Sequence, residues 1–167
     1  MNISEKISLI LIDKGFSSSP NYKTEKIIND ASKLKKTSEE ILIAKQHGIA
    51  DKLFILINGE AEFTKDHNNE LYKLATLKGV GMPMGISGLN PPSRYMADIY
   101  VKENSEYIEI DLNKLKEIEN TDPPYASFFY SYLLFQSMDL IWSSRNLNDC
   151  HPQSGFTISK GVKTGGE

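Results

Sequence analysis

The sequence has a single cysteine, Cys150, and three scattered histidines, His47, His67 and His151. One cysteine cannot form an internal disulfide or a multi-cysteine metal site, which fits a reducing compartment, so we expect a cytoplasmic protein. A metal-dependent barrel enzyme would need two histidines close in sequence, with a carboxylate and a third histidine. The sequence therefore predicts no metal site, no cofactor and no catalytic residues.

The sequence also lacks an excess of positive charge. It has 19 lysines and arginines against 22 acidic residues, a formal net charge of −3. Domains that bind nucleic acid usually carry a basic stripe that neutralises phosphates. The one short basic run, Lys33 to Lys36, is typical of a solvated strand face. We therefore expect no direct binding of nucleic acid.

Long hydrophobic runs are missing as well. The longest uncharged stretch, Pro123 to Met138, contains serines and a glutamine and is shorter than the roughly 20 apolar residues of a membrane span. The first residues, Met1 to Leu11, include Glu5 and Lys6 and lack the apolar core of a signal peptide. The sequence therefore predicts no membrane partner.

The chain of 167 residues has a length typical of one domain, with four predicted segments. Residues 1–30 are expected to be helical, and residues 31–121 to form strands. Residues 122–147 are expected to form a long helix, with Asp122 as its N-cap and Pro123 at its first position. Residues 148–167 are rich in glycine, serine and lysine, which predicts a mobile tail.

Alternating and apolar runs in the middle segment predict short strands. Lys52–Ile57 is apolar, Glu60–Thr64 alternates, and the Asn58-Gly59 pair between them is typical of a type I′ hairpin turn. Further strands are predicted at residues 71–77, 95–101 and 106–111. Short strands with a turn about every ten residues favour a mainly β fold, a sandwich or a barrel.

The order of features from Ser38 to Glu62 resembles the first half of the cyclic-nucleotide-binding domain, the β-roll module of catabolite-activator-like regulators. A strand, a turn at Gly48, Asp51, an apolar strand, Gly59 and an alternating strand follow one another there. The resemblance implies a double-stranded β-helix, a jelly-roll or β-roll, with N-terminal helices and a long C-terminal helix.

The same resemblance places a ligand-binding cassette in the second half of the roll. A helical turn opening at Gly85 presents backbone N–H groups, and Arg94 offers a fork of donors, so the two suit an anion. Ile86 stands where the family has a glutamate for the ribose hydroxyl, which predicts that cyclic AMP binds weakly or not at all. The predicted ligand-binding residues are Gly85, Ile86, Ser87, Gly88, Leu89, Arg94 and Tyr95.

Two functions remain open at this point. The first is a regulatory small-ligand-binding module that senses an anionic or nucleotide-like ligand and has no DNA-binding domain, because only a short segment follows Arg145. The second is a dimeric structural or interaction protein whose degenerate cassette binds nothing. Binding of any nucleotide distinguishes the two.

The long helix predicted from residue 122 is apolar on three sides. One roll cannot cover three sides of a helix, and in the family that the chain resembles this helix pairs with its twin. The sequence therefore predicts a homodimer, with Tyr132, Phe135 and Trp142 as contacts. The three faces are Phe128, Tyr132, Phe135 and Trp142; Phe129, Leu133 and Leu140; and Tyr130, Leu134 and Ile141.

Overall fold

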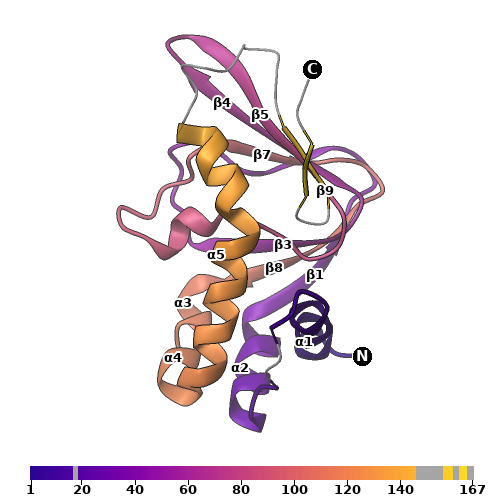
Figure 1. The fold of residues 1–167 in the computed structure, drawn as a ribbon, viewed down its shortest axis with the longest axis vertical. Coiled ribbons are helices and arrows are strands. Elements are labelled where there is room, and N and C mark those ends of the chain that lie inside the picture. The colour runs from indigo at the N-terminus through magenta and orange to yellow at the C-terminus, as the bar shows by residue number, and fades with distance from the viewer. Residues whose placement is uncertain (17–18, 146–155, 160–161, 165–167) are drawn as a thin grey trace.

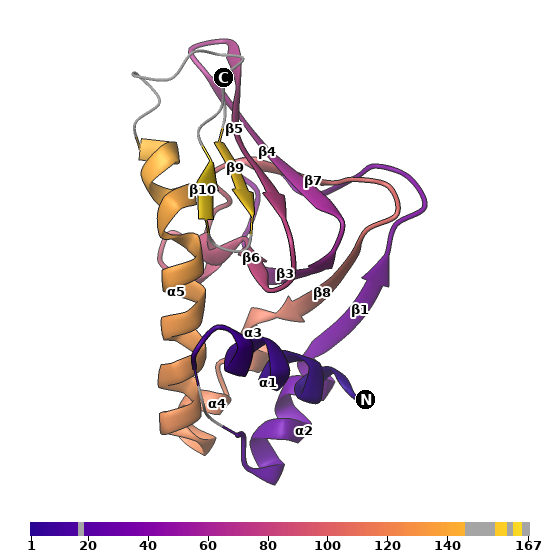
Figure 2. The same cartoon turned by 45° about the vertical axis from the view of Figure 1, so that its right-hand side comes forward.

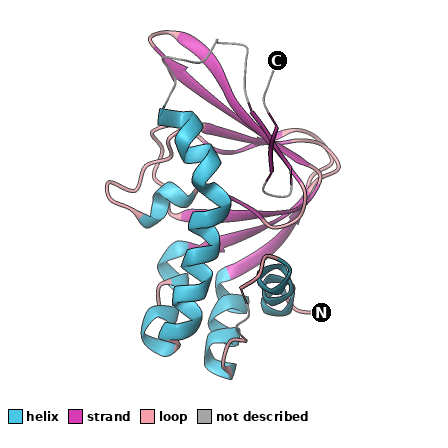
Figure 3. Ribbon diagram, viewed as in Figure 1, coloured by secondary structure: helices cyan, strands magenta, loops and turns pink. Residues whose placement is uncertain are grey.

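A computed structural model describes residues 1–16, 19–145, 156–159 and 162–164 (Figure 1). Helices come before and after the main run of strands, in the order predicted (Figure 3). The helices are α1 (Ile3–Asp13), α2 (Tyr22–Ala31), α3 (Leu112–Leu115), α4 (Ile118–Thr121) and α5 (Pro123–Arg145), with the 3₁₀ turn η1 (Ile86–Leu89). The strands are β1 (Ser32–Lys36), β2 (Ile41–Ala44), β3 (Lys52–Asn58), β4 (Glu60–His67), β5 (Glu70–Lys78), β6 (Met82–Met84), β7 (Asp98–Val101), β8 (Glu106–Asp111), β9 (Phe156–Ser159) and β10 (Val162–Thr164).

The strands form two sheets that enclose the core of a roll (Figure 2). The smaller sheet has the order β1-β8-β3-β6 and is antiparallel. The larger has the order β10-β9-β5-β4-β7-β2 and is antiparallel except for the pair of β5 with β9. This arrangement, with helices at one end and α5 along the side, confirms the predicted β-roll.

Asn58 and Gly59 connect the two sheets. β3 pairs with β6 and β8, whereas β4 pairs with β5 and β7. Gly59 has φ +90°, and a Cβ there would lie 2.2 Å from the Oγ of Ser105. The predicted hairpin is therefore wrong, because the left-handed glycine turns the chain out of one sheet and into the other.

β3 is buried on both faces, which explains why its sequence does not alternate. Phe54 and Leu56 lie in the core between the sheets. Leu53 and Ile55 lie in a second core, formed with helices α1, α2 and α5. A central strand covered by a sheet on one side and by helices on the other buries consecutive residues.

Helix caps connect the N-terminal helices to α5. Asn21 caps α2 by accepting from the N–H of Thr24 at 3.0 Å, and its own N–H donates to Oδ2 of Asp122 at 3.0 Å. The other oxygen of Asp122 accepts from the N–H of Tyr125 at 3.3 Å. This confirms Asp122 as the N-cap of α5 and anchors the start of that helix on α2.

The burial of the α5 side chains differs from what the predicted dimer contacts require. Tyr132 is fully buried and donates to the carbonyl of Gly81 at 2.7 Å, so its prediction as a contact with a second copy is wrong. Phe16, in the segment after α1, covers it at 6.2 Å between ring centroids. Phe135 is exposed, and Trp142 lies beyond the described side chains. None of the described helices, α5 included, is long and apolar enough to cross a bilayer.

The segment after residue 147 differs from the predicted mobile tail where the structure describes it. β9 pairs parallel with β5, from Ala75 opposite Phe156 to Lys78 opposite Ser159, and β10 pairs antiparallel with β9. Phe156, Thr157 and Ile158 are residue types that favour strands, and the edge of β5 offers unpaired backbone groups. The prediction of a mobile tail relied on the composition of the whole segment, which does not reveal the strand propensity of these three residues.

Candidate functional site

The predicted cassette begins at a left-handed glycine. Gly85 has φ +79° and lies between the ring of Tyr95 and the carbonyl of Lys52, which a Cβ would approach to 3.1 Å and 3.2 Å. η1 follows, and the N–H of Gly88 donates to the carbonyl of Gly85 at 3.2 Å. The predicted helical turn is therefore present.

Gly88 has a packing role in this turn. A Cβ at this position would lie 2.4 Å from the carbonyl oxygen of Ala50 and 2.4 Å from Cδ1 of Leu112. No side chain fits between η1 and those residues. The close approach of Gly88 holds the cassette against the β2–β3 connection and the start of α3.

The end of the cassette is held by backbone hydrogen bonds to the turn at Gly48. The N–H of Tyr95 donates to the carbonyl of Gly48 at 3.0 Å, and the N–H of His47 donates to the carbonyl of Tyr95 at 2.8 Å. The Arg94 side chain is exposed and donates from Nη1 to the carbonyl of His47 at 3.4 Å. Within the described part of the chain, Arg94 has no ion pair.

Tyr95 supports the cassette from the inside. Its hydroxyl donates to the carbonyl of Lys52 at 2.9 Å, and its ring packs on Phe54 at 6.5 Å between centroids. Burial, opposed by that hydrogen bond, raises the pKa of Tyr95 to about 12. Tyr95 therefore remains a neutral hydrogen-bond donor under physiological conditions.

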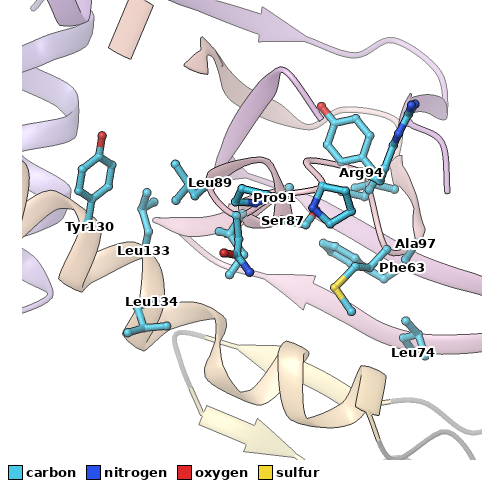
Figure 4. Close-up of a pocket in the computed structure, with 17 residues that line it drawn as sticks. Phe63, Leu74, Ser87, Leu89, Pro91, Arg94, Ala97, Tyr130, Leu133 and Leu134 are labelled. Atoms are coloured by element: carbon cyan, nitrogen blue, oxygen red, sulfur yellow. The ribbon is translucent and has the colours of Figure 1, made fainter. Parts of the chain in front are cut away.

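A cavity of about 430 Å³ lies between the cassette, the larger sheet and α5 (Figure 4). Six of the seven predicted ligand-binding residues line it, and Gly88 does not. The lining consists of Phe63 and Leu74 from the sheet, Gly85, Ile86, Ser87, Leu89, Asn90, Pro91, Pro92, Arg94 and Tyr95 from the cassette, Met96, Ala97 and Ile99 from the following strand region, and Tyr130, Leu133 and Leu134 from α5.

The α5 wall of this cavity was not among the predicted site residues. Tyr130, Leu133 and Leu134 lie across the cavity from Phe63 and Leu74. Tyr130 is held by donating to Oε1 of Glu119 at 2.7 Å, and burial together with that bond raises its pKa. One indication of an additional role for α5 was present in the sequence, because three sides of the helix are apolar and one roll cannot cover all three.

Three solved structures share this architecture. A cyclic-nucleotide-binding domain from Methylobacillus flagellatus gives a TM-score of 0.69 at 14% identity over 89% of this chain and 84% of its own. The c-di-GMP-responsive global regulator CLP of Xanthomonas campestris gives 0.63 at 15% identity, over 77% and 63%. The regulatory domain of Toxoplasma gondii PKA with cAMP gives 0.59 at 17% identity, over 85% and 56%. The chain has the fold of a cyclic-nucleotide-binding domain.

Within this cyclic-nucleotide-binding fold, the ligand is not determined by architecture. No protein-family profile and no curated protein matches the sequence. The two regulators above are named with different ligands, c-di-GMP and cAMP. The fold alone therefore does not identify a ligand for this chain.

The side chains that line the cavity are mostly apolar. Arg94 is the one charged residue among the described residues that line it, and the others are mainly apolar. That lining includes no carboxylate, histidine or cysteine that could act as a base or a nucleophile. Across the described residues as a whole, no group of three His, Cys, Asp or Glu side chains is close enough to hold a metal ion.

Proposed function

We propose that the protein is a regulatory module that senses a small anionic ligand in the cavity between the cassette and α5. The observation that carries this proposal is the convergence of two parts of the chain. Ile86, Ser87 and Arg94 from the cassette share one cavity with Leu133 and Leu134 from α5. A ligand there contacts the roll and the helix at once.

The signal in this proposal is a change in the position or stability of α5. A ligand shifts an equilibrium between two arrangements only through a difference in its affinity for them. Because the ligand touches α5, its binding free energy differs between an arrangement with the helix docked at the cassette and one with the helix displaced. The exposed Arg94 supplies the charge that selects an anion.

Ligand binding is tested with a thermal-shift screen of cyclic mono- and dinucleotides, other phosphates and small carboxylates, followed by titration calorimetry. Arg94→Gln is expected to weaken binding of the tightest-binding anion by about 1.5–3 kcal/mol, roughly 10- to 150-fold in affinity, because a charged hydrogen bond is lost. Lys45→Gln, which removes an exposed cation outside the cavity, is the control and should change little. Submicromolar binding of cyclic AMP would contradict the proposed site chemistry.

The proposed effect of ligand binding on α5 is measured separately, by tryptophan fluorescence. Trp142 is the single tryptophan of the chain and belongs to α5. The same titrations should change its fluorescence, and a ligand that binds without any change would argue against signalling through the helix.

We also propose that the protein is a homodimer through the outer face of α5. Phe128, Phe135 and Met138 are large apolar side chains that remain exposed on this helix and do not line the cavity. They follow one another at helical spacing and form a stripe that a second copy of the same helix can cover.

Light scattering at micromolar concentration tests the dimer. The wild type should give twice the 18.8 kDa chain mass, and Phe135→Glu should give a monomer, because a charge would be buried in an apolar interface. Tyr22→Glu changes an exposed aromatic residue on α2 and should leave the dimer intact. A dimer that binds none of the screened ligands would instead favour an interaction protein with a degenerate cassette.

A further inference from the structure

We infer that the ligand is an amphipathic carboxylate, with an apolar body inside the cavity and its charged group at Arg94. The inference rests on the proposed sensing function and names the chemical class of the ligand. It follows from how apolar and charged groups are distributed over the lining.

The interior of the cavity is apolar. Phe63, Leu74, Ile99 and Leu133 come from three strands and from α5, and each is buried within the fold. Phe63 and Leu74 lie across this space from Leu133 (Figure 4). Binding an apolar body there removes apolar surface of both partners from water, which is the general driving force for such pockets.

The polar groups of the lining are few, and two of them are already engaged. The hydroxyl of Tyr95 donates to the carbonyl of Lys52, and the hydroxyl of Tyr130 donates to Glu119. Ser87 and Asn90 are the other polar uncharged side chains in the described lining. A ligand with many hydroxyl and amino groups would leave several of them without partners, which weakens binding.

Arg94 is the one cation in the described lining of this apolar space, and its side chain is exposed. Its Nη1 donates to the carbonyl of His47 at the long distance of 3.4 Å. A guanidinium has five N–H donors, so most of its capacity is free for a carboxylate, which it binds in a bidentate fork. An anionic group held there stays in contact with water while the apolar part is buried.

Calorimetric titration of the full chain with octanoate, octan-1-ol, inorganic phosphate and cyclic AMP tests the inference. Octanoate should bind at least about tenfold more tightly than octan-1-ol, because a bond to a charged group contributes roughly one order of magnitude or more. Phosphate should not bind measurably, because it has no apolar body. Arg94→Gln should abolish the preference for octanoate over octan-1-ol.

Two leucines of nearly equal exposure test whether octanoate binds in this cavity. Leu134 in α5 is 56% exposed and lines the cavity, whereas Leu9 in α1 is 54% exposed and lies outside it. Leu134→Gln should weaken octanoate severalfold, and Leu9→Gln should not. Circular dichroism spectra of both variants are compared with wild type to check that each is folded.

The remaining outcomes distinguish failure of the proposed ligand class from failure of the proposed sensing function. Tighter binding of cyclic AMP than of octanoate, sensitive to Leu134→Gln, would overturn the amphipathic class and leave a ligand-sensing site in place. Octanoate binding that neither Arg94→Gln nor Leu134→Gln weakens would overturn the assignment to this cavity. No binding of any of the four probes would overturn the carboxylate class, and a negative result in the wider ligand screen would then overturn the sensing function as well.

Discussion

Replacing Gly59 with valine is expected to lower the free energy of unfolding by more than about 3 kcal/mol. Two effects add up in this variant. A β-branched residue at φ +90° is strained by about 1–3 kcal/mol, and its Cβ would lie 2.2 Å from Oγ and 2.7 Å from Cα of Ser105. Because a backbone atom is one of the obstacles, trimming the Ser105 side chain cannot relieve the overlap.

Gly15 provides the matched control for this variant. It has φ +84°, and a Cβ there would meet nothing within 4 Å. Gly15→Val therefore carries the strain without the overlap and should cost about 1–3 kcal/mol. Urea or thermal unfolding of both variants measures the difference. Equal losses of stability, or an unchanged Gly59→Val protein, would show that the close contact with Ser105 is not part of the fold.

Replacing Phe129 with alanine is expected to lower the free energy of unfolding by about 3–5 kcal/mol, the usual loss for a buried phenylalanine. Its side chain is 1% exposed, and its ring stacks on Tyr125 at 6.3 Å between centroids. It also lies 6.1 Å from the ring of Tyr132. The cavity left by the removed ring is surrounded by the sheet and by α5 itself, so it cannot collapse fully.

The neighbouring residue is the control. Phe128 is 42% exposed, and Phe128→Ala should cost less than about 1 kcal/mol in the folding of one chain. Unfolding is measured at two protein concentrations, because the midpoint of a dimer rises with protein concentration whereas the midpoint of a monomer does not. A larger loss for Phe128→Ala than for Phe129→Ala at both concentrations would mean that α5 is rotated from its position in the structure.

The strands were predictable because their signals are local. Alternation at Glu60–Thr64 and Glu106–Asp111 and the apolar run at Lys52–Ile57 each determine a strand without reference to the rest of the chain. Partner choice is not local. Asn58-Gly59 has the composition of a hairpin turn, yet the pairing energy of β3 comes from β8 and β6, so the chain changes sheets at Gly59.

The cassette side of the candidate site was predictable, and the α5 side was not. Gly85, Ile86 and Arg94 lie within a short segment whose order of residues resembles a known motif. Leu133 and Leu134 are far from it in sequence, and nothing in their own segment states which surface they contact. The sequence of α5 showed only that three of its sides are apolar.

The sequence by itself determined the mainly β architecture, the capped start of α5 at Asp122 and the position of the cassette, because hydrophobic period, capping and turn residues act over a few neighbours in the chain. Only the tertiary structure decided which apolar side chains of α5 are buried in the fold, which line the cavity and which stay exposed. The neighbours Phe128 and Phe129 are chemically identical, and Tyr132 and Phe135 share one predicted face. Their burial depends on where the four-stranded sheet, Phe16 and the cassette pack around the helix, and those contacts exist only once distant parts of the chain have come together.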